Sequence, residues 1–509
     1  MKSLSRAAVF SLGLILTAKG LSLLKEVLLA YKYGTSYLND AYSICISLPP
    51  VLFAVFASGI AQSYIPTMSR IEGKRERAAF FNNVMTTLFL ASIVLCVICV
   101  VFDKNIVHLL APGFNEETAE LTRRFVDIII WFLPLYVIFN ILSAESQVNE
   151  SFVMPNFCDN IVVNTVIIVF ILISTKATVD LIVIGQDVSI LIAVIILGIY
   201  CWSVLGTRYR PLVSFRDKNL ALLFKLALPL GISVMANQIN SVTDRIFSSY
   251  IGEGITSALG YANRVQFLFL TLTTTVFMSI CFPRMNTLFF KGKTQDGLCY
   301  VEKGILLASL IAIPFMMVMI VYSAPVIRIL FERGVFNARS TQITSECLVC
   351  YAVGIPFYAL AEIGNKTLAA SLKQRCIMKN TLIMVSINII LDLLLINALR
   401  HRGLALATSI SGMVSVALIY SDLHRFRLLP MIRPVIRQTA IISIAAAAST
   451  AVSLVLYRIA SGVRGIPFVL SFVASIMLFG LVYALLCAGL KVSIFSWLLS
   501  KIREIGRKA

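Results

Sequence analysis

Fourteen long apolar segments follow one another along this chain of 509 residues, and they constrain its fold more than any other feature. Each segment is long enough for a helix to cross the hydrocarbon core of a bilayer, which takes about twenty residues. The segments are continuous, whereas strands of a membrane barrel alternate apolar and polar residues. We therefore predict an all-α polytopic membrane protein with about fourteen transmembrane helices. The segments are approximately residues 7–31, 40–66, 80–102, 125–148, 157–173, 180–204, 221–250, 255–283, 304–322, 342–365, 376–397, 403–422, 438–457 and 466–489.

The composition excludes a soluble protein. Only 14% of the residues are charged and 59% are hydrophobic, while a soluble domain has about a quarter of its residues charged. The basic N-terminus resembles the start of a signal peptide, but the apolar stretch after it is long and contains Lys19 and Lys25. We expect this stretch to be retained as the first helix.

The distribution of Lys and Arg predicts the orientation. With the N-terminus inside, the cytoplasmic segments and the helix ends that adjoin them carry 27 of these residues, and the external loops carry 12. This bias places both termini in the cytoplasm. The net charge of +19 follows from this topology, so we expect no nucleic-acid partner. The basic tail is predicted to lie on anionic headgroups; its cations are Lys501, Arg503, Arg507 and Lys508.

An internal repeat divides the chain. Residues 109–115 resemble residues 329–337, at an offset of about 220, and Pro66 corresponds to Pro283 at an offset of 217. Each repeat contains six predicted helices, so both face the same way, as in transporters built from parallel repeats. We predict an N-lobe at 1–215, a C-lobe at 216–430 and two additional helices with the tail at 431–509.

Enzyme signatures are missing from the sequence. Gly292-Lys293-Thr294 lacks the upstream glycine of a phosphate-binding loop, because position 287 is Thr. Neither a zinc-protease nor a serine-hydrolase motif is present. We expect the protein not to be an enzyme.

Ionisable residues within the apolar segments are the candidate functional residues, because a charge in lipid is costly. Lys19 and Glu26 are seven positions apart and share a helix face, from which Lys25 is rotated. One interpretation is a Lys–Glu pair that braces the helices. The other is a cavity lined by cations, including Arg264 of the repeat-related eighth helix, that binds an anion such as a diphosphate.

A second group is rich in acids and amides. Asn388 and Asp392 are four apart on helix 11, Thr408 follows in helix 12, and Asp244 precedes Arg245 in helix 7. The acids could form structural pairs with arginine. Alternatively, oxygen ligands of this kind suit a small hard cation, which would couple transport to an ion gradient.

At these residues the sequence resembles the MurJ (MviN-type) lipid II flippases of the multidrug/oligosaccharidyl-lipid/polysaccharide exporter superfamily. The resemblance spans nearly the whole chain. Its best-matching stretches are residues 40–42, 48–49, 109–115, 243–245, 257–264, 330–336 and 403–409.

The resemblance implies two lobes that open alternately, with helices 13 and 14 forming a groove for a polyprenyl tail. It implies that substrate is bound by Lys19, Lys25, Asp40 and Arg264. We add Glu26 to this predicted substrate site because it shares a helix face with Lys19. The resemblance also implies a Na⁺ site at Asp244, Asn388, Asp392, the carbonyl of Leu404, and Thr408.

This sequence departs from the family pattern in and near the cavity. Both helix 1 cations are usually Arg, and Lys does not form a bidentate clamp on phosphate. Phe53 and Ala54 stand where the family has a basic residue, and Ser58 replaces an acid. We therefore expect a less cationic cavity than in typical members.

These observations predict a monomeric flippase in a bacterial cytoplasmic membrane, with membrane lipids around it and no cofactor except Na⁺ as a coupling ion. The expected substrate is an undecaprenyl-diphosphate-linked saccharide, with lipid II the first candidate. Another polyprenyl-linked polysaccharide unit is the second candidate. A drug antiporter of the same superfamily would have cavity carboxylates without cations, and a non-transporting scaffold would pair its buried charges internally.

Overall fold

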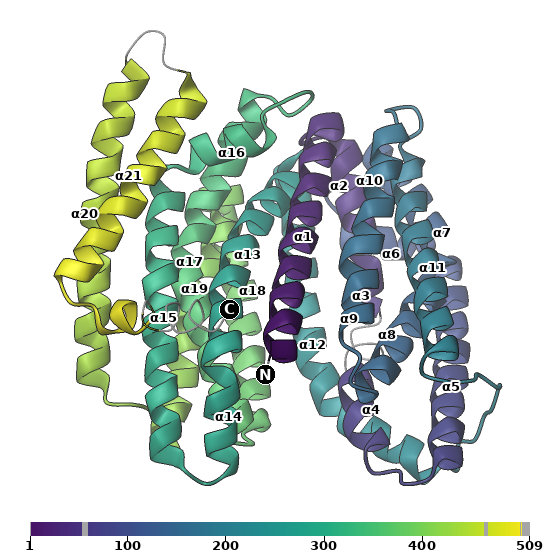
Figure 1. Cartoon of the computed structure of the whole chain (residues 1–509). Helices are drawn as coiled ribbons and strands as arrows, with labels where there is room; N and C mark the ends of the chain where they lie inside the picture. Colours follow the sequence, from purple (N-terminus) through teal and green to yellow (C-terminus); the bar gives the residue numbers. More distant parts are fainter. Residues whose placement is uncertain (1, 53–59, 463–466, 499, 501–509) are drawn as a thin grey trace. The chain divides into compact units, whose positions relative to one another are not determined.

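The computed structural model describes residues 2–52, 60–462, 467–498 and 500 (Figure 1). These residues form helices joined by short connections, and none of them forms a strand. The departures noted at Phe53, Ala54 and Ser58 lie outside the described residues, as do the four cations of the basic tail.

The helices of the first half of the chain are α1 (Lys2–Tyr33), α2 (Tyr37–Cys45), α3 (Leu48–Leu52), α4 (Ile60–Met68), α5 (Lys74–Val101), α6 (Asp103–Leu110), α7 (Glu116–Ile130), α8 (Leu133–Val148), α9 (Val153–Phe157), the π-helical turn η2 (Cys158–Val162), α10 (Val163–Ile173) and α11 (Asp180–Ser203). Those of the second half are α12 (Lys218–Ile251), α13 (Ile255–Ile280), α14 (Phe282–Phe290), α15 (Thr294–Val321), α16 (Ser323–Phe331), α17 (Ala338–Ala370), α18 (Gln374–Leu399), α19 (His401–Arg425), α20 (Ile432–Gly462) and α21 (Phe468–Gly489).

The predicted all-α membrane fold is confirmed. Within the described residues, nine helices are long and apolar enough to cross a membrane, or up to eleven when two bent pairs are each counted as one span. The remaining predicted spans correspond to α1, α12 and the α2–α4 segment. Two of these, α1 and α12, carry ionisable residues, and the third is divided into short helices. The structure is thus consistent with the predicted total of about fourteen.

Proline residues account for the two bent spans. The α7–α8 pair bends by 48° and the α13–α14 pair by 47°. The second helix of each pair has proline in its first turn, Pro134 and Pro283 respectively. Proline has no N–H to donate to the preceding turn but fits the start of a helix, so each span is interrupted and restarts at the proline.

The chain forms two compact units. The first contains residues 1–257 together with 333–337, and the second contains residues 258–332 and 338–509. Helix α12 belongs to the first unit, where it packs against α4, although the repeat assigns it to the second set of six helices. The division into lobes at residues 215 and 430 stays a prediction based on the repeat.

A buried carboxylate lies in the core of the first unit. Glu145 of α8 accepts a hydrogen bond from the Tyr64 hydroxyl at 2.7 Å and one from Thr207 Oγ1 at 3.2 Å. The Tyr64 ring in turn stacks on Phe80, with ring centroids 5.5 Å apart. These contacts join α4, α5, α8 and the connection after α11 into one core.

The second unit is built around α17, which packs against α15, α16 and α19. Helices α20 and α21, which lie outside the repeat, pack against each other, and α20 also packs on α15 (Figure 1). The Tyr322 hydroxyl donates to Ser453 Oγ of α20 at 2.9 Å, and the Tyr322 ring meets Tyr457 and Phe472 edge-on. These contacts attach the last two helices to the second unit.

Residues 333–337 cover the end of α1 within the first unit. The Val335 N–H donates to the Tyr31 carbonyl at 2.9 Å. Gly334 has a φ of +63°, and a Cβ atom placed there would lie 2.3 Å from the same carbonyl oxygen. Only glycine satisfies both the backbone conformation and this close approach.

Candidate functional site

The cations of α1 lie on the helix that packs against α10 and η2 in the first unit. Lys19 is partly buried. Lys25 Nζ lies 3.6 Å from Glu26 Oε1, and the two side chains are 18% and 6% exposed. Helix geometry places Glu26 on the same face as Lys19 and rotates Lys25 away from it. The long Lys25 side chain nevertheless reaches Glu26. Asp159 of η2 also interacts electrostatically with Lys25.

Asp40 belongs to α2, and its side chain contacts the N-terminus of α13. It is only 1% exposed and accepts three hydrogen bonds. Its Oδ2 accepts from the Gly254 N–H at 2.6 Å, and its Oδ1 accepts from the N–H and hydroxyl of Ser257 at 2.8 and 2.6 Å. A carboxylate in this position satisfies N–H groups that have no partner within the helix and interacts favourably with the helix dipole. The contact of Asp40 with substrate stays a prediction.

Four of the five predicted sodium ligands lie on α18 and α19, which pack together in the second unit. Asn388 and Asp392 are fully buried. Asn388 Nδ2 lies 3.5 Å from Ser411 Oγ, which donates to the Thr408 carbonyl at 2.7 Å. Thr408 Oγ1 donates to the Leu404 carbonyl at 3.0 Å. The structure therefore brings Asn388 of α18 close to Ser411 of α19, which contacts the Thr408 carbonyl, and the Na⁺ site stays a prediction.

The other two predicted residues lie elsewhere. Asp244 is on α12 of the first unit and is partly buried. Arg264 is on α13 of the second unit and is also partly buried. Its helix is held within that unit on both sides, because the Tyr261 ring packs on Phe331 at 5.0 Å and Gln266 Nε2 donates to the Tyr351 carbonyl at 2.9 Å.

Sequence reasoning missed a buried acid of the first unit. Asp187 of α11 has no exposed surface, and neither of its carboxylate oxygens has a hydrogen-bond partner among the described residues. It lies within electrostatic range of Tyr42 and Cys45 of α2 and Tyr136 of α8. Its position in the middle of an apolar segment is the signal by which the sequence identifies it.

The family model described as "Lipid II flippase MurJ" matches residues 29–479 of this chain. The chain belongs to the MurJ family. The match begins in α1 and includes every predicted site residue except Lys19, Lys25 and Glu26, which directly precede it.

Curated MurJ relatives match over most of their length. The "Probable lipid II flippase MurJ" of Rickettsia prowazekii is 27% identical over 431 residues, which cover 82% of this chain and 83% of the relative. That of Helicobacter pylori is 29% identical over 411 residues, covering 75% and 86%. The "Lipid II flippase MurJ" of Thermosipho africanus is 27% identical over 417 residues, covering 80% and 83%.

Solved structures confirm the fold. A MurJ lipid II flippase in an inward closed conformation superposes with a TM-score of 0.80 at 23% identity, covering 95% of this chain and 99% of that one. An inward-facing multidrug resistance MATE transporter of the MOP superfamily superposes with a TM-score of 0.67 at 13% identity, covering 80% and 94%. The MurJ fold predicted from the resemblance is therefore present.

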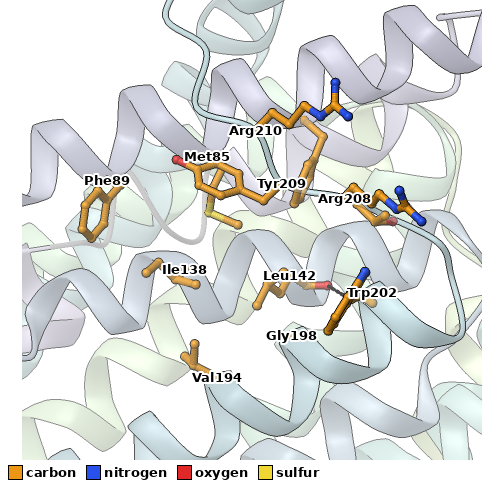
Figure 2. Close-up of a pocket in the computed structure, with 13 residues that line it drawn as sticks. Met85, Phe89, Ile138, Leu142, Val194, Gly198, Trp202, Arg208, Tyr209 and Arg210 are labelled. Atoms are coloured by element: carbon orange, nitrogen blue, oxygen red, sulfur yellow. Dashed lines mark hydrogen bonds between the residues drawn. The ribbon is translucent and has the colours of Figure 1, made fainter.

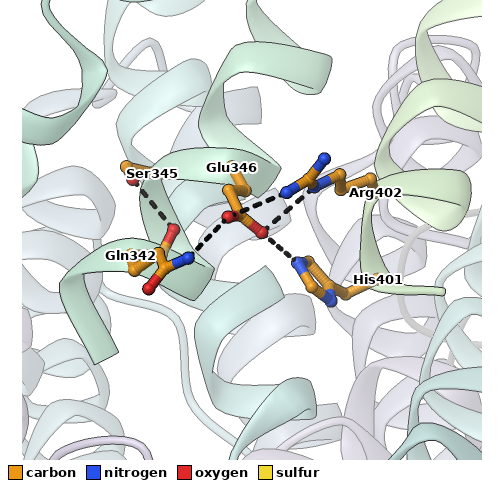
Figure 3. A network of polar contacts seen from close by, with 5 residues as sticks. All are labelled: Gln342, Ser345, Glu346, His401 and Arg402. Atoms are coloured by element: carbon orange, nitrogen blue, oxygen red, sulfur yellow. Dashed lines mark hydrogen bonds and ion pairs between the residues drawn. The ribbon is translucent and has the colours of Figure 1, made fainter. Parts of the chain in front are cut away.

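A polar network ties α17 to the start of α19 in the second unit of this MurJ family member (Figure 3). Glu346 lies at its centre. Arg402 approaches both carboxylate oxygens, with Nη2 2.9 Å from Oε1 and Nε 3.1 Å from Oε2. His401 Nε2 lies 2.8 Å from Oε2, and Gln342 Nε2 donates to Oε1 at 3.1 Å. Bidentate pairing of this kind is stronger than a single ionic contact.

Replacing Glu346 by glutamine should destabilise the second unit by about 1–3 kcal/mol, because hydrogen bonds to a charged group are lost or weakened. Thermal unfolding of the purified protein in detergent measures this effect. Glu362→Gln is the matched control on the same helix, since the Glu362 side chain is 40% exposed and pairs with Lys366 one turn away. An exposed pair contributes about 0–1 kcal/mol. Equal effects of the two changes would contradict a stabilising role for the network.

Proposed function

We propose that this chain moves lipid II, an undecaprenyl-diphosphate-linked saccharide, from the inner to the outer leaflet of a bacterial cytoplasmic membrane by alternating access. The observation that carries the proposal is the match of the lipid II flippase family model to residues 29–479. The multi-span helical fold supports it, because a transporter of this kind needs many membrane-spanning helices.

In this proposal Lys19, Lys25 and Arg264 bind the diphosphate. All three side chains are partly buried, so their charges are less screened by water than charges on the surface. The 3.6 Å separation between Lys25 Nζ and Glu26 Oε1 is longer than the 2.7–2.9 Å of a charge-assisted hydrogen bond. An ammonium group has three N–H donors, so Lys25 could donate one to a phosphate oxygen while Glu26 balances part of its charge.

Complementation tests the proposed function. The gene should restore growth to a bacterial strain depleted of its own lipid II flippase, and the purified protein should move fluorescent lipid II across vesicle membranes. The control is the same chain with Lys19, Lys25 and Arg264 all replaced by alanine, inserted in the membrane at an equal level. Failure of the unaltered chain in both assays, despite normal insertion, would refute the proposal.

We further propose that Na⁺ binds at Asn388, Asp392, the Leu404 carbonyl and Thr408, with Asp244 as an additional ligand, and that its binding helps reset the empty transporter. The presence of an amide, a carboxylate and a hydroxyl side chain on the two packed helices α18 and α19 supports this proposal, because hard cations prefer oxygen ligands. The burial of Asp392 also supports it, since a bound cation would offset the cost of the buried carboxylate.

Sodium should raise the unfolding temperature of the purified protein, and Asp392→Asn should abolish this rise. Ligand binding stabilises the folded state by about 1.4 kcal/mol when the ligand is at ten times its Kd. Unfolding is compared in NaCl and in choline chloride at equal ionic strength. Asp296→Asn, at an exposed acid of α15, is the control and should keep the response. A response that is equal in Asp392→Asn and the unaltered protein would exclude this site.

A further inference from the structure

An apolar pocket of about 800 Å³ lies within the first unit, between α5, α8 and α11 (Figure 2). Its volume falls within the range of small-molecule sites, roughly 300–1,000 Å³. The apolar part of its lining comes from three helices and includes Phe81, Met85, Phe89, Ile138, Leu142 and Val194. The predicted function and its site residues do not involve this pocket.

The pocket has an apolar end and a cationic end. Figure 2 shows Phe89, Ile138 and Val194 on one side of the pocket and Arg208 and Arg210 on the other. The two arginines are exposed and belong to the connection that follows α11. By the charge bias this connection is predicted to be cytoplasmic. A ligand that fits both ends is an amphiphile with an anionic head.

Hydrogen bonds to α5 fix the position of the cationic connection. Asn82 Oδ1 accepts a hydrogen bond from the backbone N–H of Arg210 at 2.9 Å. Thr86 Oγ1 accepts from the Leu212 N–H at 3.2 Å and lies 3.0 Å from the Tyr209 hydroxyl. The backbone that carries the arginines is thus held against the pocket before any ligand binds, which lowers the entropic cost of binding.

The surroundings of the pocket suit the lipid–water interface. Trp202, which lines the pocket, is 65% exposed, and Tyr209 is 48% exposed. Exposed aromatic residues with polar groups are enriched at the level of the lipid headgroups. Leu90 of α5 and Ile195 and Ile199 of α11 are exposed apolar residues on the helices that border the pocket, as expected for a lipid-facing surface.

We propose that this pocket binds an anionic phospholipid of the cytoplasmic leaflet, with an acyl chain between α5, α8 and α11 and the phosphate at Arg208 and Arg210. Two observations carry the proposal. The apolar pocket suits a lipid acyl chain, and the two exposed guanidinium groups suit a phosphate. The proposal does not depend on lipid II being the transported substrate.

Fluorescence quenching by brominated lipids tests this site, because Trp202 lines it. Trp131 and Trp497 are replaced by phenylalanine, which leaves Trp202 as the only tryptophan of the three in the chain. The protein is reconstituted in mixed phosphatidylglycerol and phosphatidylcholine vesicles in which one of the two lipids is brominated. We expect brominated phosphatidylglycerol to quench the fluorescence of Trp202 much more strongly than its mole fraction in the bilayer would predict.

Charge removal at the pocket should abolish this preference. Each arginine near an anionic lipid contributes about fivefold in affinity, so Arg208→Gln/Arg210→Gln should lower the relative affinity for phosphatidylglycerol roughly 25-fold. Arg216→Gln/Lys218→Gln is the matched control, because it removes two exposed charges just beyond the pocket. The proposal would be overturned if both lipids quenched Trp202 equally in the protein with the unaltered pocket. It would also be overturned if the control variant lost as much affinity for phosphatidylglycerol as the pocket variant.

Two further measurements identify the occupant. Gly198→Phe places a ring in the pocket, where an added Cβ would have space, and should reduce quenching by phosphatidylglycerol to that of phosphatidylcholine. Undecaprenyl phosphate added in amounts equal to the protein should leave the quenching unchanged. If it displaces the phospholipid, the pocket holds a polyprenyl-linked lipid and the proposal is wrong.

Discussion

Replacing Arg264 by alanine is expected to reduce lipid II flipping in reconstituted vesicles about 10- to 150-fold, while the amount of folded protein stays the same. The range corresponds to the loss of hydrogen bonds to a charged group, about 1.5–3 kcal/mol. The expectation rests on the position of Arg264 on α13, between contacts that hold this helix in the second unit. A fixed backbone presents the guanidinium in one place, so no neighbouring cation can readily substitute for it.

Two further variants separate charge from geometry at this position. Arg264→Lys keeps the charge but loses bidentate contact with phosphate, so we expect flipping intermediate between alanine and arginine. Arg375→Ala removes an exposed arginine at the start of α18 and should flip normally. Normal flipping by Arg264→Ala would show that this residue does not bind the diphosphate.

Replacing Asp40 by alanine is expected to cost about 3 kcal/mol or more of stability. The change leaves the buried N–H groups of Gly254 and Ser257 without their acceptor, and leaves the Ser257 hydroxyl only a longer bond of 3.3 Å to the Gly254 carbonyl. Each buried donor left unsatisfied costs about 1–3 kcal/mol. The unfolding temperature in detergent and the yield of folded protein measure the effect, and Glu116→Ala, at an exposed acid of α7, is the control.

A double-mutant cycle with Ser257→Ala tests whether the loss arises at this helix terminus. The two changes remove the same contact, so their combined cost should be smaller than the sum of their separate costs. The variant Asp40→Asn addresses the predicted contact with substrate. It keeps an acceptor oxygen for α13, so a loss of flipping with nearly unchanged unfolding temperature would favour substrate binding. Additive costs in the cycle would contradict the capping role.

The sequence was sufficient to predict the helical membrane fold, because twenty-residue apolar segments have few alternatives in a bilayer. The bends at Pro134 and Pro283 follow from the chemistry of proline, although Pro283 had been used only to align the repeat. The four-residue spacing of Asn388 and Asp392 predicted that they share one face of α18, whereas their approach to α19 through Ser411 could not be derived from spacing.

Contacts that depend on side-chain reach or on chain connections could not be predicted in this way. Helical spacing places Lys25 and Glu26 on different faces, yet the flexible lysine reaches the neighbouring carboxylate. Asn82 and Thr86 are ordinary polar residues near the end of an apolar helix until the connection after α11 folds back onto them. The pocket beside them exists only once that fold is known.

The short segment of residues 333–337 determines how the two units are joined covalently. It packs on the end of α1, while α16 before it and α17 after it belong to the other unit. The polypeptide therefore crosses between the units three times, after residues 257, 332 and 337. A single cut between α12 and α13 would leave two of these connections intact. Neither unit can be obtained by itself by dividing the chain at one position, and any rearrangement of one against the other must be accommodated at three peptide connections at once.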